Sequence, residues 1–298
     1  MKPRLARVGL LLTLQCPSQC RHCFFQAGPH RSEEMPRELG VKVVEEASAL
    51  GAGWLSLTGG EPFTRVELME FFTRLGVERG MRVEAVTNGF WASDMDTAVS
   101  ILERLRRRGL RFLSISVDDF HQENIPLERV KTAYHAAVSL GLRVVLLVCV
   151  GQGSKLNAQT VPKALGADRV QVVGGPPVEH PEALLIESPY TSTTPQNPKP
   201  GRAFLHTLRC EALLTDIGVD PYGNVLPCCG PLASQVSLGS LREEALEEIL
   251  VKAWRDPLLE TLRRGVEVDW GPRFKCQACL EWYGKRKEEA LKTGSNGV

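Results

Sequence analysis

Short apolar runs alternate with segments of helical periodicity over the first 175 residues of the chain. Runs rich in Val, Ile, Leu and Phe lie at 8–14, 54–57, 83–87, 112–117, 144–150 and 170–173. Apolar runs of this length, bounded by glycine or polar residues, predict buried β-strands. The last five runs begin roughly 30 residues apart, which is the length of a strand followed by a helix.

Between these runs, apolar residues recur at intervals of three and four. Segments 41–50, 68–75, 98–105 and 130–140 each place one apolar stripe on a predicted helix. Six strands alternating with helices predict an α/β fold with a parallel sheet. Six units are too few for an eight-stranded barrel, which leaves a partial barrel or a doubly wound sheet. We expect a partial (β/α)6 TIM-like barrel, and both folds place the chemistry at the carboxyl ends of the strands.

The pattern changes after residue 175. Seven prolines lie between residues 174 and 200, which predicts an extended connector over 176–200. Residues 216–219 and 225–226 flank the turn sequence Asp-Pro-Tyr-Gly-Asn and predict a hairpin, while 241–254 and 285–292 have helical character. We therefore expect two domains, 1–175 and 201–298, the second a small α+β domain whose core needs a staple.

The overall composition excludes several classes of protein. Apolar residues make up 43% and charged residues 24%, as in an ordinary globular protein. Lys and Arg number 36 against 35 Asp and Glu, so no basic excess indicates nucleic-acid binding. The longest apolar runs are far too short to cross a membrane, and 8–14 lacks the features of a secretion signal. We expect a cytoplasmic protein.

Nine cysteines are the unusual part of the composition. An odd number cannot pair completely within one chain, and clustered reduced thiols indicate metal binding. Cys16, Cys20 and Cys23 form a C-x3-C-x2-C motif directly after the first predicted strand. Three thiolates can hold three irons of a four-iron cube and leave the fourth open to an external ligand, whereas structural zinc requires four protein ligands.

This motif, with the aromatic His22 before its last cysteine, resembles the signature of the radical S-adenosylmethionine (SAM) superfamily. Three further segments resemble that family in order: Thr58-Gly-Gly-Glu-Pro62, Thr87-Asn-Gly89 and Ser116-Val-Asp118. The resemblance implies a 4Fe–4S cluster at Cys16, Cys20 and Cys23 whose open iron binds SAM. It also implies SAM contacts from Gly59, Gly60, Glu61, Asn88, Ser116 and Asp118. Reductive cleavage of SAM would give a 5′-deoxyadenosyl radical that abstracts a substrate hydrogen.

A second cysteine group lies in the C-terminal part. Cys210, Cys228, Cys276 and Cys279 supply four thiolates, and from their spacing alone zinc and a four-iron cube fit equally well. With Gly223, they resemble the pattern of the SPASM/twitch domain, which implies an auxiliary 4Fe–4S cluster and thus two clusters in all. Cys228 fits that pattern better than its neighbour Cys229, and Cys149, inside an apolar strand, is expected to be a core residue.

The catalytic acid or base is open, and we consider Asp119 and His121, which follow the fourth strand, as candidates. Enzymes with this domain resemble maturases of peptides or proteins, so a peptide substrate is the first hypothesis, with a separate peptide-recognition protein as partner. The alternative is oxidation or rearrangement of a small molecule such as a sugar or cyclitol, and a non-enzymatic zinc scaffold is the third possibility. A reductant such as flavodoxin or ferredoxin would supply the electron.

Overall fold

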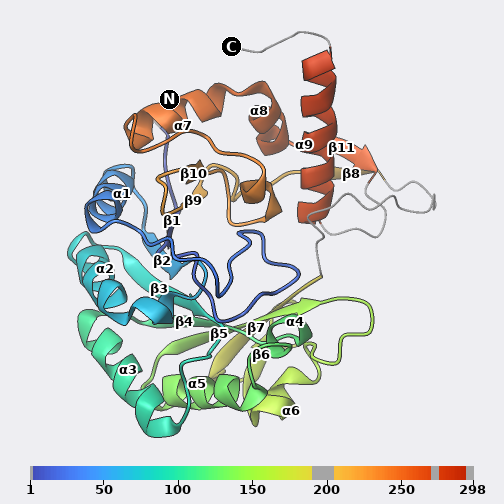
Figure 1. Cartoon of the computed structure of the whole chain (residues 1–298). Coiled ribbons are helices and arrows are strands. Elements are labelled where there is room, and N and C mark those ends of the chain that lie inside the picture. Colours follow the sequence, from blue (N-terminus) through green and yellow to red (C-terminus); the bar gives the residue numbers. More distant parts are fainter. Residues whose placement is uncertain (1–2, 190–204, 270–274, 293–298) are drawn as a thin grey trace.

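The computed structural model describes residues 3–189, 205–269 and 275–292 and is built around one sheet (Figure 1). Strands β1 to β5 follow one another in sequence order across the middle of this sheet, and all their pairings are parallel. Their bounds are β1 Arg7–Leu11, β2 Trp54–Thr58, β3 Arg82–Thr87, β4 Phe112–Ser116 and β5 Arg143–Val150. The α/β fold with a parallel sheet is therefore confirmed, and the carboxyl ends of these strands lie along one edge.

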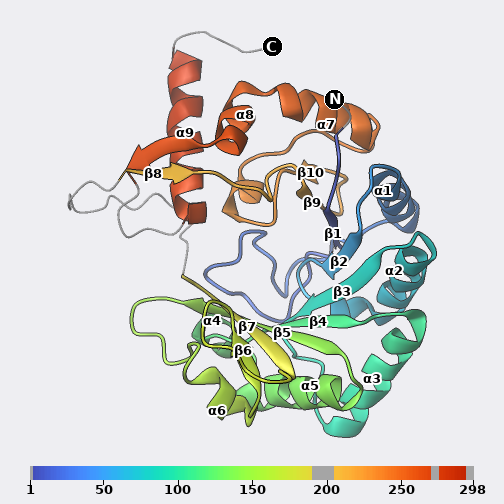
Figure 2. The ribbon, with the colours of Figure 1, turned by 180° about the vertical axis from the view of Figure 1, so that it is seen from behind.

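The helices between these strands cover one face of the sheet, as both views show (Figures 1 and 2). They are α1 Arg37–Ala49, α2 Val66–Glu78, α3 Met95–Arg108 and α5 Leu127–Ser139, with the short α4 Asp119–Gln122 and α6 Val161–Leu165 near β5 to β7. Their apolar stripes and alternate strand residues form one large buried cluster. Local signals set the helix ends: Asp94 accepts a hydrogen bond from the Thr97 amide at the start of α3, and Gly109 ends it with φ +111°.

The segment predicted as a connector contains a strand. β7, Ala183–Pro189, pairs in parallel with both β5 and β6 (Val170–Val172), so it lies between them in the sheet. Seven prolines suggested an extended link, but residues 183–188 contain none, and their apolar residues alternate between the core and the opposite face. Proline at the end of a strand is compatible with a sheet. Of the rest of the predicted connector, residues 176–182 lie in the loop between β6 and β7, and residues 190–200 lie outside the described residues.

The predicted hairpin is present, and it belongs to the same sheet. β9 (Asp216–Val219) and β10 (Val225–Leu226) pair antiparallel, and β9 also pairs in parallel with β1. The complete order is β10-β9-β1-β2-β3-β4-β5-β7-β6. A segment from the last third of the chain is thus hydrogen-bonded to the first strand.

The rest of the C-terminal part forms a C-terminal body that packs on the main core at the end of the molecule opposite α5 and α6 (Figure 1). It contains the 3-10 helix η2 Pro231–Ser234, helices α7 Leu246–Arg255, α8 Pro257–Arg264 and α9 Lys275–Lys292, and the antiparallel pair β8 Leu205–Leu208 and β11 Val266–Asp269. They share a small hydrophobic cluster, to which α7 contributes Ala253. Leu246, Ile249 and Leu250 of α7 belong instead to the main core. Among the helices described, none combines the length and the apolar character that a membrane crossing requires.

Candidate functional site

The loop that follows β1 carries the first cysteine motif, and it folds back across the carboxyl ends of the strands. Backbone hydrogen bonds join the beginning and the end of this loop. The Leu14 amide donates to the Glu33 carbonyl at 3.0 Å, and the Cys16 amide donates to the Gly28 carbonyl at 3.1 Å. A tight turn follows, in which the Cys23 amide donates to the Cys20 carbonyl. These bonds fix all three thiols at the sheet edge where the sequence predicts chemistry.

Gly59 and Gly60 hold this loop against β2. The Gly60 amide donates to the Thr13 carbonyl at 2.6 Å, and the Glu61 amide donates to the Gln15 carbonyl at 2.8 Å. A Cβ on Gly59 would lie 2.3 Å from the Thr13 oxygen, and one on Gly60 would lie 2.2 Å from the Gln15 oxygen. Only glycine allows this approach of two backbones. The pair therefore positions the residues leading into Cys16, in addition to any contact with a ligand.

One cavity of about 290 Å³ brings most of the predicted site residues together. Its lining includes Cys16, Cys20, Cys23, Gly59, Gly60, Glu61, Asn88, Ser116 and His121. These residues come from the loop after β1, from the ends of β2, β3 and β4, and, for His121, from α4. Segments separated by up to a hundred residues of sequence thus face one hollow, which is the arrangement expected for a cofactor and substrate site.

The three thiols suit an iron–sulfur cluster. Burial raises the pKa of Cys16 to about 12 and that of Cys20 to about 11, so a bare thiolate is disfavoured there. Bound metal cations reverse this preference, because coordinating thiols are deprotonated. Hydrogen bonds to the Cys16 sulfur come from the Ser18 amide at 3.4 Å and the Asn88 side-chain amide at 3.5 Å, and the Ser18 hydroxyl lies 3.1 Å from the Cys20 sulfur. Such bonds are typical of cluster sites.

Glu61 presents a buried carboxylate at the cavity. Oε1 accepts hydrogen bonds from the Thr87 hydroxyl at 2.8 Å and the Phe63 amide at 3.1 Å, and Oε2 accepts one from the Asn88 amide at 2.8 Å. Burial raises its pKa to about 7, although these bonds act in the opposite direction. A positively charged ligand group in the cavity would favour the carboxylate form, as the expected contact with an ammonium requires.

Thr87 and Trp91 support this carboxylate from behind. The Trp91 indole donates to the Thr87 hydroxyl at 2.9 Å, and its ring stacks on Phe63 with centroids 4.2 Å apart. Trp91 is not among the residues that line the cavity. It therefore positions Thr87 and, through it, Glu61.

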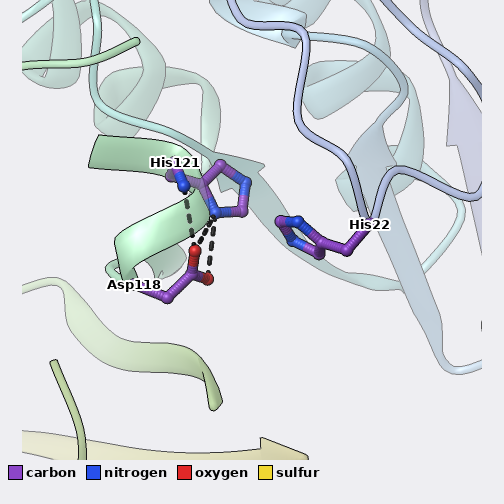
Figure 3. A group of neighbouring side chains, drawn as sticks. All are labelled: His22, Asp118 and His121. Atoms are coloured by element: carbon purple, nitrogen blue, oxygen red, sulfur yellow. Dashed lines mark hydrogen bonds and ion pairs between the residues drawn. The ribbon is translucent and has the colours of Figure 1, made fainter. Parts of the chain in front are cut away.

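Asp118 is engaged with His121, as Figure 3 shows. His121 Nδ1 lies 2.9 Å from each carboxylate oxygen, and the His121 backbone amide also donates to Asp118 at 3.0 Å. Burial raises the pKa of Asp118, but the bonds from His121 outweigh it, and the pKa is lowered. The Asp118 carboxylate is thus oriented toward the His121 imidazole. His121 lines the cavity and Asp118 does not. The SAM contact expected of Asp118 stays a prediction.

His22, on the cysteine loop, lies next to this pair, with its ring beside that of His121 (Figure 3). Its ring centroid lies 4.9 Å from that of His121 and 4.9 Å from that of Phe120. Its buried Nδ1 has no hydrogen-bond partner among the described residues. Burial lowers the pKa of His22 to about 4, so the ring is neutral near neutral pH and presents a flat, uncharged surface to the cavity.

Asp119 faces elsewhere. Its carboxylate accepts hydrogen bonds from the Lys155 amide at 2.7 Å and the Leu156 amide at 3.1 Å, which ties α4 to the loop after β5. It lines a different, outer hollow and is not among the residues around the cysteines. Of the two predicted catalytic candidates, only His121 reaches the cavity.

The second cysteine group gathers in the C-terminal body. Cys276 and Cys279 lie on the first turn of α9, three residues apart and thus on one helix face. The hydrophobic cluster that contains Cys279 packs against Cys210 and Cys228. Burial raises the pKa of Cys279 to about 12, with the nearby thiols of Cys210 and Cys276 adding to the rise. Four close thiols held in this way fit a metal cluster.

Gly230 lies against two of these sulfurs. A Cβ there would lie 3.5 Å from the Cys276 sulfur and 3.8 Å from the Cys228 sulfur. The Gly230 amide also donates to the Cys228 sulfur at 3.4 Å. Cys229, in contrast, is exposed. The Cys229 thiol also interacts electrostatically with those of Cys210 and Cys276. The assignment of Cys228 as the ligand therefore stays a prediction.

Sequence reasoning did not identify Phe24 and Phe25 as site residues. Both line the cysteine cavity, and both also line a second hollow of about 440 Å³ that extends toward Tyr222 and η2. Their position immediately after Cys23 is the signal that could have pointed to them. They separate the region of the first cysteine group from the C-terminal part.

Comparison with known families agrees with this geometry. The model described as "Radical SAM superfamily" matches residues 10–156, and the one described as "Iron-sulfur cluster-binding domain" (SPASM) matches residues 210–280. The chain belongs to the radical SAM superfamily. The predicted membership and the C-terminal SPASM-type domain are confirmed, and the protein is a radical SAM enzyme that requires SAM and iron–sulfur clusters.

Named relatives of this radical SAM enzyme include peptide-modifying proteins. "PqqA peptide cyclase" from Granulibacter bethesdensis is 24% identical over 98% of this chain and 85% of its own length. Among solved structures, anSMEcpe with bound AdoMet and Cp18Cys peptide has a TM-score of 0.57 at 14% identity, covering 96% of this chain and 97% of the other. BtrN in complex with AdoMet and 2-DOIA has a TM-score of 0.52 at 15% identity, covering 89% and 87%. These structural matches show the shared fold.

Proposed function

We propose that this radical SAM enzyme modifies a residue of a peptide or protein, after hydrogen abstraction by a 5′-deoxyadenosyl radical. The observation that carries the radical chemistry is the single cavity in which Cys16, Cys20 and Cys23 face Glu61 and Ser116. The peptide assignment is supported by the relative of Granulibacter bethesdensis, which matches nearly the whole chain and is named for a peptide substrate.

We assign the SAM-binding cluster to Cys16, Cys20 and Cys23. When bound, the cluster and SAM supply the radical that abstracts hydrogen. Around them, Ser18 and Asn88 donate hydrogen bonds to the sulfurs. Of the residues expected to contact SAM, Gly59, Gly60, Glu61, Asn88 and Ser116 line the same cavity.

We assign an auxiliary 4Fe–4S cluster to Cys210, Cys228, Cys276 and Cys279, and the cluster-binding part to the predicted domain 201–298. Four thiolates complete the ligation of the four irons, so this cluster would transfer electrons without binding substrate. A reductant such as flavodoxin or ferredoxin would supply the reducing electron, and a separate recognition protein would present the peptide.

His121 is our candidate for the proton acceptor. Asp118 accepts a hydrogen bond from Nδ1 of His121. This holds the proton on Nδ1 and leaves Nε2 of His121 as the basic atom. A radical oxidation that ends in a new bond or a double bond releases one proton, and His121 is positioned on the cavity wall to receive it. Asp119 is excluded from this role by its bonds to the loop after β5.

The test is anaerobic reconstitution, iron analysis and measurement of 5′-deoxyadenosine after addition of reductant. Two clusters predict about eight irons per chain, and replacing Cys16, Cys20 and Cys23 with Ala is expected to leave about four. The triple variant should form no 5′-deoxyadenosine. Cys149→Ala is the matched control, since this thiol lies on β5 outside both groups. SAM cleavage that survives the triple change would refute the assignment.

The substrate class needs a separate measurement. Mass spectrometry of candidate peptides encoded beside the gene should show a mass change that depends on SAM and reductant. Turnover of a sugar or cyclitol, with no change in any peptide, would instead establish the small-molecule alternative.

A further inference from the structure

Strands β5 and β7 leave one apolar face open. In β5, Val144, Leu146 and Val148 are buried against the helices, while the alternate residues Val145 and Leu147 point to the opposite face and are half-buried. In β7, Leu185 is buried, whereas Leu184 and Ile186 remain 42% and 41% exposed. We call Val145, Leu147, Leu184 and Ile186 the aliphatic wall.

The register of the sheet makes the wall one continuous surface. Val145 lies directly beside Leu184, and Leu147 directly beside Ile186. Because adjacent partners in a sheet point to the same face, these four side chains form a block two residues wide and two residues long.

The same register joins the wall to the cysteine cavity. Ser116, which lines that cavity, is the β4 partner of Leu147. Val86 of β3 also lines the cavity. Its partner on β4 is Ser114, and the partner of Ser114 on β5 is Val145. The wall is therefore the next part of the face on which the radical would be formed.

Exposure of this kind is unusual for a parallel sheet, whose two faces are normally both covered. Among the described residues, six large apolar side chains are exposed, and two of them are the neighbouring Leu184 and Ile186. Val77 and Met95, in comparison, lie on the outer helices α2 and α3. An apolar surface open beside a reactive cavity is expected to be covered by a ligand.

The chemistry of the wall selects the kind of group that can cover it. None of its four side chains can donate or accept a hydrogen bond, so hydroxyl groups placed on it would lose their water partners without replacement. Polar side chains border the wall only at its edges: Ser114 and Ser116 on the β4 side, and Gln171 on the β6 side. Gln171 already donates a hydrogen bond to the Pro176 carbonyl and accepts one from the Val178 amide. A polyol fits this surface poorly, and a hydrocarbon side chain fits it well.

We propose that the aliphatic wall binds an apolar side chain of the substrate peptide, adjacent to the carbon that loses hydrogen. This inference rests on the proposed function and specifies its substrate: a peptide with an aliphatic or aromatic residue at or beside the modified position.

The test is direct binding to the reconstituted holoenzyme with SAM and no reductant, measured by saturation-transfer NMR. The probes are N-acetyl-L-leucinamide, which presents an aliphatic side chain on a peptide unit, and myo-inositol, which presents only hydroxyl groups. Ile186→Thr and Leu184→Thr make the wall polar while keeping residues that strands accept. Val77→Thr is the matched control, because Val77 is 44% exposed on the outer helix α2.

We expect saturable binding of N-acetyl-L-leucinamide and none of myo-inositol. Each wall variant should weaken the leucinamide about tenfold through lost apolar contact, and Val77→Thr should leave it unchanged. Binding of leucinamide that is absent, or is insensitive to both wall variants, overturns the proposal, as does tighter binding of myo-inositol.

The two proposals can fail separately in this design. Addition of reductant to the wild-type samples tests 5′-deoxyadenosine formation without reference to the wall. Wall-dependent binding without SAM cleavage would refute only the proposed function, and cleavage without wall-dependent binding would refute only the aliphatic wall.

Discussion

Replacing Gly60 with Ala is the sharpest test of how the site is assembled. The new Cβ would lie 2.2 Å from the Gln15 carbonyl oxygen and 2.8 Å from the Leu14 carbonyl carbon. Carbon and oxygen atoms need about 3.3 Å, so the two backbones must separate by about 1 Å. This separation breaks or lengthens two backbone hydrogen bonds, from the Gly60 amide to the Thr13 carbonyl and from the Glu61 amide to the Gln15 carbonyl.

The cost can be worked out from these contacts. Overpacking a rigid site costs about 1 to 3 kcal/mol, and each weakened hydrogen bond adds about 1 kcal/mol or less. We therefore expect Gly60→Ala to lower the free energy of unfolding by about 2 to 4 kcal/mol. Because the moved backbone leads directly into Cys16, iron binding at the first site and SAM cleavage should fall as well.

The assay is urea unfolding of the metal-free protein, followed by iron analysis and 5′-deoxyadenosine measurement after reconstitution. Gly53→Ala is the matched control, since it lies just before the same strand and a Cβ there meets nothing within 4 Å. It should change stability by less than about 0.5 kcal/mol. Wild-type stability and wild-type iron in Gly60→Ala, or equal losses in both variants, would refute the close-packing explanation.

Three further predictions follow from other contacts. Gly230→Ala should leave the metal-free fold intact, because the new Cβ would lie at a contact distance of 3.5 Å from the Cys276 sulfur. Iron analysis should nevertheless show less iron at the auxiliary site. The control is Gly284→Ala on α9, where a Cβ meets nothing within 4 Å, and this variant should retain the auxiliary iron. Glu61 has a pKa raised by burial from 4.5 to about 7, so the folded metal-free protein keeps a proton that the unfolded chain releases. Measured by urea unfolding, the stability of the wild type relative to Glu61→Gln should fall by about 3 kcal/mol as the pH rises from 4.5 to 7. The two proteins are compared because His22, whose pKa burial lowers to about 4, stabilises both of them as the pH rises through the same range. A difference in stability that does not change with pH would contradict this account of Glu61. Trp91→Phe should keep the aromatic stack but lose the bond to the Thr87 hydroxyl, lowering thermal stability by about 1 kcal/mol by calorimetry; an unchanged transition would contradict its supporting role.

Much of the fold is encoded in local pattern. The six predicted strands are present with small shifts at their ends, and the motifs at the ends of strands β1 to β4 do meet at one edge. This succeeds because apolar periodicity specifies each element, and parallel pairing brings successive carboxyl ends together.

The remaining features depend on contacts that local pattern does not encode. Prolines around β7 concealed a strand that only its neighbours β5 and β6 complete. The hydrogen bond between Asp118 and His121 is a contact that the sequence motif alone does not reveal. The close approach of Gly60 to Gln15 depends on the relative position of two segments that lie far apart in the sequence. A motif in one segment does not reveal where the other segment lies.

The position of β9 has a consequence for how the chain is made. β1 carries the cysteine loop and pairs on one side with β2 and on the other with β9, which comes from the last third of the sequence. During synthesis the earlier strands can associate while one edge of β1 still lacks its partner, and pairing across such a sequence separation is slow. The cysteine loop therefore reaches its final support only after β9 has been synthesised. Delivery of iron to the first site is expected to follow that step.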